Sequence, residues 1–207
     1  MKKLNRKFYQ RDTIQVCKSI LGKVLVHNSR EGLTSGQIVE VEAYIGPDDP
    51  ASHAYLNRKT ERTKVQYGKR GCAYIYQIYG NQFCFNIVTG RNANPEVILV
   101  RALEPISGVK LMIKRRRIKG ENLNNLMNGP AKLCRAMGID KSLYGEDLCG
   151  EVLYIIDDGF KLSPEKIMAT PRINIDYAGE AKNNLWRFII RGNLFVSHQK
   201  TLFRKLA

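Results

Sequence analysis

The sequence predicts a single α+β domain, residues 1–207, with a mostly antiparallel sheet. Three observations support this prediction. Segments with the two-residue alternation of strands outnumber those with helical spacing, two of them are joined by a short turn, and no repeat or linker rich in Pro, Gly or Ser divides the chain. Because 43% of the residues are hydrophobic, the chain can form one sizeable core.

Helices are expected where apolar residues recur at helical spacing between suitable end signals. In the first helix, Asp12 is the expected N-cap and Gln15 stands at the reciprocal capping-box position. In the second, Ile106 begins the expected buried stripe, and Gly138 closes the third. The expected helices are residues 12–21, 106–119 and 128–137.

Strands are expected where alternating segments rich in β-branched and aromatic residues lie between turn residues. The turn Gly80-Asn81 makes two of these segments an antiparallel hairpin. The expected strands are residues 23–27, 37–45, 72–79, 83–88 and 96–103, with others near 151–157, 167–173 and 185–190.

The strand at 37–45 places a carboxylate and an aromatic ring on one face. Side chains two residues apart in a strand point the same way, so Glu40, Glu42 and Tyr44 share a face. Gly46-Pro47 then ends the strand.

The charge balance narrows the classes of partner. The chain has 34 Lys and Arg against 19 Asp and Glu, a net charge of +15, which favours DNA, RNA or an anionic membrane surface. The N-terminus is basic but lacks the apolar segment of a signal peptide, and no stretch reaches the length of a transmembrane helix. We therefore expect a protein that is not secreted and does not contact a membrane. It is expected to be cytoplasmic and nucleoid-associated in a bacterium, or nuclear in a eukaryote.

Several classes of enzyme lack their motif in this sequence. Only three histidines occur, and there is no H-E-x-x-H, no Walker A loop and no C-x-x-C. Metalloproteases, zinc deaminases and P-loop NTPases are therefore disfavoured. The five cysteines are an odd number, which argues against a disulfide framework.

Several blocks in a fixed order cover nearly the whole chain. They are Phe8-Tyr9-x-Arg11-Asp12, Leu21-Gly22-Lys23, residues 39–54 with Glu40-x-Glu42-Ala43-Tyr44, residues 74–80, 100–105 and 128–134, and Arg191-Gly192 with Val196-Ser197. With these blocks the chain resembles the 3-methyladenine DNA glycosylase family of the alkyladenine, or methylpurine, type. The resemblance implies a curved, barrel-like sheet surrounded by helices, a monomer, no metal or organic cofactor, and duplex DNA carrying damaged purines as the partner. It also implies a monofunctional glycosylase of base-excision repair, which flips out alkylated or deaminated purines, hydrolyses the N-glycosidic bond and leaves an abasic site.

The resemblance assigns the chemistry to Glu42 and Arg101. Glu42 matches the glutamate that holds the water attacking the sugar C1′, and a carboxylate there can also stabilise an oxocarbenium-like sugar. Arg101 matches an arginine near that water and the nucleotide's phosphate. Without the resemblance, Glu42 is an ordinary solvated carboxylate and Arg101 a partner in a salt bridge to Glu42 or Glu104. Glu40 is expected to be structural or to position water.

The base pocket follows from the same resemblance. Tyr44, His53 and Tyr76 match the residues that sandwich the flipped base, and aromatic faces suit a cationic alkylated purine. Asn86 matches an asparagine that rejects the exocyclic amine of guanine, and Leu99 is expected to line the pocket. The structural alternatives are half-buried strand aromatics and satisfied polar groups.

Tyr79 matches the residue that enters the minor groove and fills the gap left by the flipped nucleotide. The sequence departs from the family pattern at Asn81, Leu56-Asn57 and Arg70, in loops expected to touch DNA. The basic run at 114–119 is either a DNA-backbone contact or a solvated helix end.

Three other functions remain open from the sequence: a non-catalytic nucleic-acid-binding module, a glycosylase that uses a lysine Schiff base, and a protein that binds an anionic small molecule or a membrane. The glycosylase hypothesis requires Glu42 and the aromatic rings to converge on a cavity sized for one nucleobase. The hypothesis fails if the Glu42 side chain is sealed in an ion pair or directed away from the rings.

Overall fold

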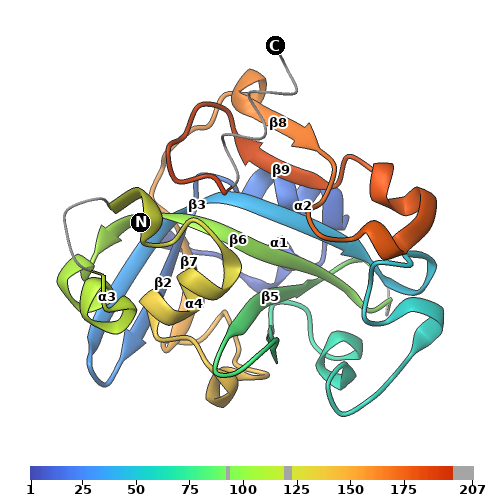
Figure 1. Ribbon diagram of the computed structural model, residues 1–207, viewed down its shortest axis with the longest axis horizontal. Helices are drawn as coiled ribbons and strands as arrows, with labels where there is room; N and C mark the ends of the chain where they lie inside the picture. Colours follow the sequence, from blue (N-terminus) through green and yellow to red (C-terminus); the bar gives the residue numbers. More distant parts are fainter. Residues whose placement is uncertain (92–93, 119–122, 198–207) are drawn as a thin grey trace.

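A computed structural model describes residues 1–91, 94–118 and 123–197. The fold is α+β, as predicted, and its strands form one antiparallel sheet that curls into a half-barrel (Figure 1). The strand order is β1-β7-β2-β3-β6-β5-β4, and β9 pairs with both β3 and β8. None of the helices in this part of the chain is long and apolar enough to cross a membrane.

Each predicted strand overlaps one in the structure, and the hairpin of β4 and β5 is antiparallel as expected. β3 begins earlier than predicted because residues 32–36 pair with β2 through a short turn. The strands are β1 (Lys2–Lys3), β2 (Val24–Ser29), β3 (Gly32–Ile45), β4 (Ala73–Gln77), β5 (Phe83–Thr89), β6 (Glu96–Ser107), β7 (Leu153–Asp157), β8 (Ile167–Thr170) and β9 (Arg187–Ile190).

The α-helices pack against this sheet, α2 on β3 and β6 and α4 on β5 and β6. Asp12 caps α2 as predicted, because its side chain accepts a hydrogen bond from the Gln15 backbone N–H at 2.9 Å. The α-helices are α1 (Arg6–Tyr9), α2 (Thr13–Ile20), α3 (Val109–Arg116) and α4 (Pro130–Met137). The 3-10 helices are η1 (Gly46–Asp48), η2 (Tyr55–Asn57), η3 (Lys64–Tyr67), η4 (Leu123–Asn125), η5 (Lys141–Leu143), η6 (Pro164–Lys166) and η7 (Asp176–Asn183).

The helix predicted for 106–119 was wrong at its start. Ile106 belongs to β6, which continues to Ser107 by pairing with β3, and its side chain is 50% exposed instead of buried. Gly108 separates strand from helix: its φ is +77°, and a Cβ there would lie 2.4 Å from the Leu33 carbonyl oxygen. Only then does α3 begin, with Met112 buried as expected.

Two arginines of the basic run at the end of α3 form contacts within the protein, whereas Lys114 and Arg117 are exposed. Arg115 bonds to Glu31, Ser29 and the Ala136 carbonyl, and Arg116 donates to the Leu126 carbonyl. In Figure 1, α3 lies at the left, whereas the loops after β3 lie at the right. These contacts support an intramolecular role for the two arginines; residue 119 lies outside the described residues.

Candidate active site

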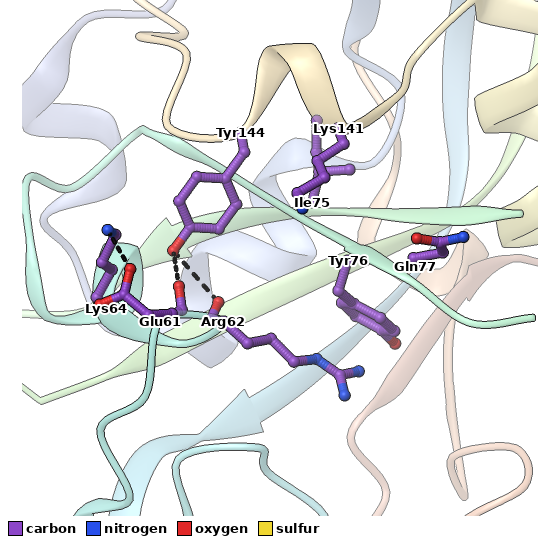
Figure 2. A pocket seen from close by; sticks show the side chains of 8 residues that line it. All are labelled: Glu61, Arg62, Lys64, Ile75, Tyr76, Gln77, Lys141 and Tyr144. Atoms are coloured by element: carbon purple, nitrogen blue, oxygen red, sulfur yellow. Dashed lines mark hydrogen bonds and ion pairs between the residues drawn. The ribbon is translucent and has the colours of Figure 1, made fainter. Parts of the chain in front are cut away.

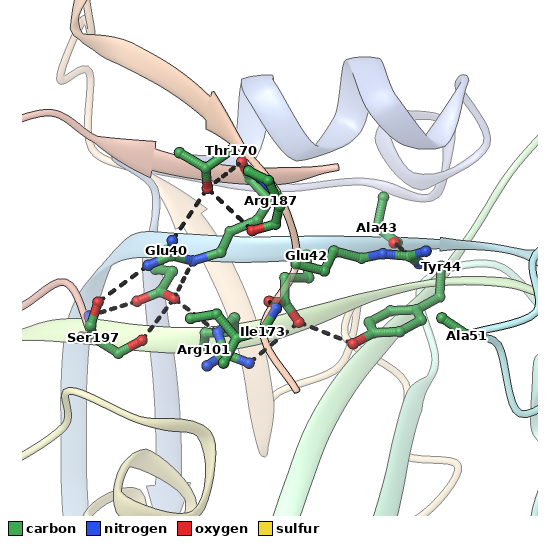
Figure 3. A network of polar contacts seen from close by, with 12 residues as sticks. Glu40, Glu42, Ala43, Tyr44, Ala51, Arg101, Thr170, Ile173, Arg187 and Ser197 are labelled. Carbon is green, nitrogen blue, oxygen red and sulfur yellow. Dashed lines mark hydrogen bonds and ion pairs between the residues drawn. The ribbon is translucent and has the colours of Figure 1, made fainter. Parts of the chain in front are cut away.

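One face of β3 carries the polar residues around which the site is built. Glu40, Glu42 and Tyr44 alternate along the strand, as predicted, and join one network of polar contacts (Figure 3). The pairing of β3 with β6 shifts register at Glu40, and β9 replaces β2 as the other neighbour there. Strands therefore enclose the carboxylates on both sides, and neither glutamate has exposed surface.

The Glu42 carboxylate is held by three donors. Its Oε2 accepts from the Tyr44 hydroxyl at 2.9 Å and from Arg101 Nη1 at 3.2 Å, and its Oε1 accepts from the Ile173 backbone N–H at 2.8 Å (Figure 3). The carboxylate thus faces an aromatic ring, as the hypothesis requires, but it also lies in an ion pair, which counts against it. Because an ionised carboxylate accepts about four hydrogen bonds, roughly one position is left for a water molecule.

Arg101 links the two glutamates. Its Nε donates to Glu40 Oε1 at 2.8 Å, and its Nη1 donates to Glu42. Burial lowers the pKa of Arg101, but the charges of Glu42 and Glu40 raise it by more than burial lowers it. The pKa of Arg101 is therefore above its ordinary value. Arg101 is therefore a permanent cation, and its salt bridge joins Glu42 and Glu40 and not Glu104.

Glu40 is a structural hub. It accepts hydrogen bonds from Arg101, from Arg187 Nε at 2.8 Å, and from the backbone N–H and hydroxyl of Ser197 at 2.7 and 2.8 Å. Burial raises the pKa of Glu40, but the two arginines and the Ser197 N–H lower it more, and the net shift is downward. With about four acceptor positions taken, Glu40 fits the structural role expected for it.

Most of the residues predicted for the base pocket line one small cavity. Tyr44, His53, Tyr76 and Asn86 all contribute to its wall. The rings of His53 and Tyr76 meet edge to face with their centroids 4.7 Å apart. The other lining residues are Ala51, Gln66, Tyr74, Val97 and Tyr177.

The cavity is smaller than the nucleobase-sized one expected. Its volume is about 40 Å³, which has room for a few waters. A hollow of about 450 Å³ shares Tyr76 with it (Figure 2), and another of about 480 Å³ shares His53. A purine can therefore enter only if side chains at the mouth move. Leu99 is not among the lining residues; it lies on β6 opposite Glu42 and Asn86.

His53 is a neutral imidazole whose tautomer can be assigned. Arg62 Nη2 approaches His53 Nε2 at 3.3 Å, and because a guanidinium only donates, this nitrogen accepts. Nδ1 then carries the hydrogen and donates to the Tyr74 hydroxyl at 2.8 Å. Burial, followed by the charges of Arg62 and Arg58, lowers the pKa of His53 to about 4.

Arg62 lines the larger hollow that shares Tyr76 with the cavity. Its guanidinium carbon lies 4.7 Å from the centroid of the Tyr76 ring, a cation–π contact visible in Figure 2. Burial, followed by the neighbouring Cys84, raises the pKa of Tyr76 well above its ordinary value, so this wall of the cavity is uncharged.

Tyr79 lies in the turn between β4 and β5, and 75% of its surface is exposed. A side chain in this place can project from the protein, as the prediction for Tyr79 requires. Among the departures from the family pattern, Asn81 and Leu56-Asn57 are exposed. Arg70 is buried, and its side chain donates within the protein to the backbone carbonyls of Gln66, Gly68, Gly90 and Asn94. That its loop touches DNA stays a prediction.

Comparison with known proteins gives matches over nearly the whole chain. A family model described as methylpurine-DNA glycosylase matches residues 7–194. A protein of Clostridium acetobutylicum is 51% identical over 201 residues, covering 94% of this chain and 97% of the relative. One of Clostridium novyi is 48% identical over 203 residues, covering 95% and 99%. Both relatives carry the provisional name 3-methyladenine DNA glycosylase.

The chain belongs to the methylpurine-DNA glycosylase family. The family resemblance seen in the sequence is thereby confirmed. The protein is a DNA glycosylase, a hydrolase of N-glycosyl bonds that acts in base-excision repair.

The glycosylase site also contains groups that the sequence did not indicate. Arg172 and Asp49 form a fully buried bidentate ion pair at 2.5 and 2.8 Å, and the guanidinium lies 4.8 Å from the Tyr44 ring centroid. This pair anchors the segment whose next residue, Ile173, donates to Glu42. The sequence cannot indicate that the backbone N–H of Ile173 donates to Glu42, because every residue type except proline has this group. Tyr74 could have been predicted as a lining residue because it shares a strand face with Tyr76.

Proposed function

We propose that this glycosylase rotates a damaged purine out of duplex DNA into the cavity of Tyr44, His53 and Tyr76. A water molecule on Glu42 then cleaves the N-glycosidic bond. The observation that carries the proposal is the hydrogen bond from the Tyr44 hydroxyl to Glu42 Oε2, which joins the aromatic wall to the carboxylate. The two relatives described above are named for 3-methyladenine, and we extend this substrate to the present chain.

The proposed reaction is a hydrolysis at the sugar C1′. The C1′–N bond breaks and its electrons leave with the base, while a water molecule on the free acceptor position of Glu42 attacks C1′ and passes its proton to the carboxylate. The products are an abasic site and the free base. The negative charge of Glu42 also stabilises the cationic sugar that forms on the way, and Arg101 holds the carboxylate in place.

The cavity wall suits a cationic base because it carries no positive charge of its own. With its pKa near 4, His53 is neutral at physiological pH, and burial, followed by the charge of Glu42, raises the pKa of Tyr44 well above its ordinary value. Alkylation at N3 or N7 makes the purine both a good partner for aromatic faces and a good leaving group. Tyr79 fills the gap left in the duplex, and the cost of unstacking is lowest for weakened pairs, which contributes to selectivity.

The test is base release by the Glu42→Gln variant. Duplexes carrying 3-methyladenine, 7-methylguanine, hypoxanthine or ethenoadenine are incubated with excess enzyme, and the freed base and duplex affinity are measured separately. We expect release to fall by about two to four orders of magnitude while binding persists. Glu104→Gln, on the neighbouring strand, is the matched control and should act as wild type.

Three results contradict the proposal. If Glu42→Gln and the wild type release base at equal rates, Glu42 is not in the mechanism. If borohydride traps a covalent complex with abasic-site DNA, the enzyme uses a lysine Schiff base and is not monofunctional. Binding of damaged DNA without release of any base would identify a non-catalytic binding module.

A further inference from the structure

Gln66 is a fully buried amide that lines the base cavity. It lies in η3, its side chain has no exposed surface, and it stands among the lining residues with Tyr44, Tyr76 and Asn86. No prediction from the sequence gave this residue a role.

The amide of Gln66 makes no well-formed hydrogen bond to the protein. Neither its Oε1 nor its Nε2 meets the distance and angle of a hydrogen bond in the described residues, although the amide lies close enough to the Tyr74 hydroxyl to lower the pKa of Tyr74 against the larger, upward effect of burial. In the described residues, no other buried polar atom without a partner belongs to a side chain that lines this cavity. Buried polar groups are nearly always paired, so an unpaired amide facing a cavity points to a ligand that completes it.

The backbone holds Gln66 rigidly in this position. Its N–H donates to the Thr63 carbonyl at 2.9 Å, and its own carbonyl accepts from Arg70 Nη1 at 3.3 Å. Arg70 further bonds the carbonyls of Gly68, Gly90 and Asn94. The amide is therefore presented to the cavity by a fixed loop, as recognition by hydrogen bonding requires.

A primary amide offers an acceptor and a donor side by side. This pair is complementary to a purine edge that places a donor opposite the amide oxygen and an acceptor opposite the amide nitrogen. Glutamine binds purine edges through two such hydrogen bonds. A 6-oxopurine such as hypoxanthine presents the O6 acceptor beside the N1–H donor. The cavity of about 40 Å³ has room for a few waters, which an entering base would displace.

We propose that Gln66 is a specificity-determining residue for neutral 6-oxopurines, donating from Nε2 to O6 and accepting at Oε1 from N1–H. This inference rests on the proposed function of the cavity. When the C1′–N bond of hypoxanthine breaks, negative charge develops on a neutral base, and a donor at O6 stabilises it. A cationic alkylated purine leaves without this help, so it depends less on Gln66.

The test compares two lesions in the Gln66→Met variant, which keeps the length of the side chain and removes the amide. Single-turnover release of hypoxanthine is expected to fall by about tenfold to hundredfold, and release of 3-methyladenine, which has an amine in place of O6, by less than about threefold. Because the amide makes no well-formed hydrogen bond to the protein, the Tm of Gln66→Met should equal or exceed that of the wild type.

Gln37→Met is the matched control. The amide of Gln37 donates to the Gly22 carbonyl at 3.2 Å, away from the cavity, so this variant should lose stability and keep the wild-type ratio of the two rates. An unchanged ratio in Gln66→Met, or a Tm loss as large as that of Gln37→Met, overturns the assignment of Gln66. Failure of the wild type to release either base would instead overturn the proposed function.

Discussion

The hydroxyl of Tyr44 donates a 2.9 Å hydrogen bond to Oε2 of Glu42, two residues earlier on β3. The same Tyr44 ring forms part of the cavity wall. Burial and the charge of Glu42 raise the pKa of this phenol well above its ordinary value, so it remains a donor at every working pH. One side chain therefore connects the surface that would hold a base with the carboxylate that would activate water.

Replacing Tyr44 by Phe keeps the ring and removes the hydroxyl. A hydrogen bond to a charged group is worth about 1.5–3 kcal/mol, so we expect single-turnover base release to slow by roughly tenfold to hundredfold. Duplex affinity should stay within about twofold because the stacking surface remains. Tyr154→Phe, on β7, is the control, and equal rates for the two variants would show that the bond to Glu42 is not used in the reaction.

Replacing Glu40 by Gln leaves Arg101 and Arg187 without their shared carboxylate. Removing one partner of a buried ion pair lowers the free energy of unfolding by about 3–5 kcal/mol, and we expect a loss of this size in Glu40→Gln. Urea denaturation measures it. Glu151→Gln should change the free energy of unfolding by less than about 0.5 kcal/mol, because Glu151 is exposed and pairs only with Lys3.

The loss of free energy of unfolding in Glu40→Gln depends on pH. Since the pKa of Glu40 is lowered in the folded protein, its stabilising effect is present above the ordinary value of 4.5 and is lost as the pH falls through the folded value. A difference between the two proteins that does not shrink in acid contradicts this account.

His53 should titrate with a pKa of about 4, far below the ordinary value of 6.5. The unfolded chain binds a proton in this interval and the folded protein does not, so the stability contributed by neutral His53 is lost as the pH falls from 6.5 to 4. An imidazole NMR titration checks the value. Arg62→Gln should raise it, because the charge of Arg62 disfavours protonation; a midpoint near 6.5 in the wild type would show that His53 is not buried as described.

Replacing Tyr79 by Ala should leave the free energy of unfolding within about 0.5 kcal/mol, because this side chain is largely exposed. Extrusion of the target base should nevertheless become less favourable, since nothing fills the gap in the duplex. A fluorescent base analogue at the lesion site reports extrusion directly. Phe160→Ala removes another exposed ring and serves as the control; the same extrusion in both variants would remove Tyr79 from the proposed mechanism.

The sequence by itself determined the local structure and the family. Alternation along 37–45 placed Glu40, Glu42 and Tyr44 on one face, and Asp12 and Gly138 marked helix ends, because such signals depend on neighbours in the chain. The start of α3 was misplaced because β6 is extended by pairing with a distant strand, a contact that periodicity does not register.

Only the tertiary structure decided the ion pairs and hydrogen bonds of the site. The pairing of Arg101 with both glutamates and the N–H of Ile173 on Glu42 join residues far apart in the sequence. The fold also buries the amide of Gln66 in the cavity wall without a well-formed hydrogen bond. The energies of buried polar groups depend on which partners surround them in space, and the order of residues along the chain does not encode those partners.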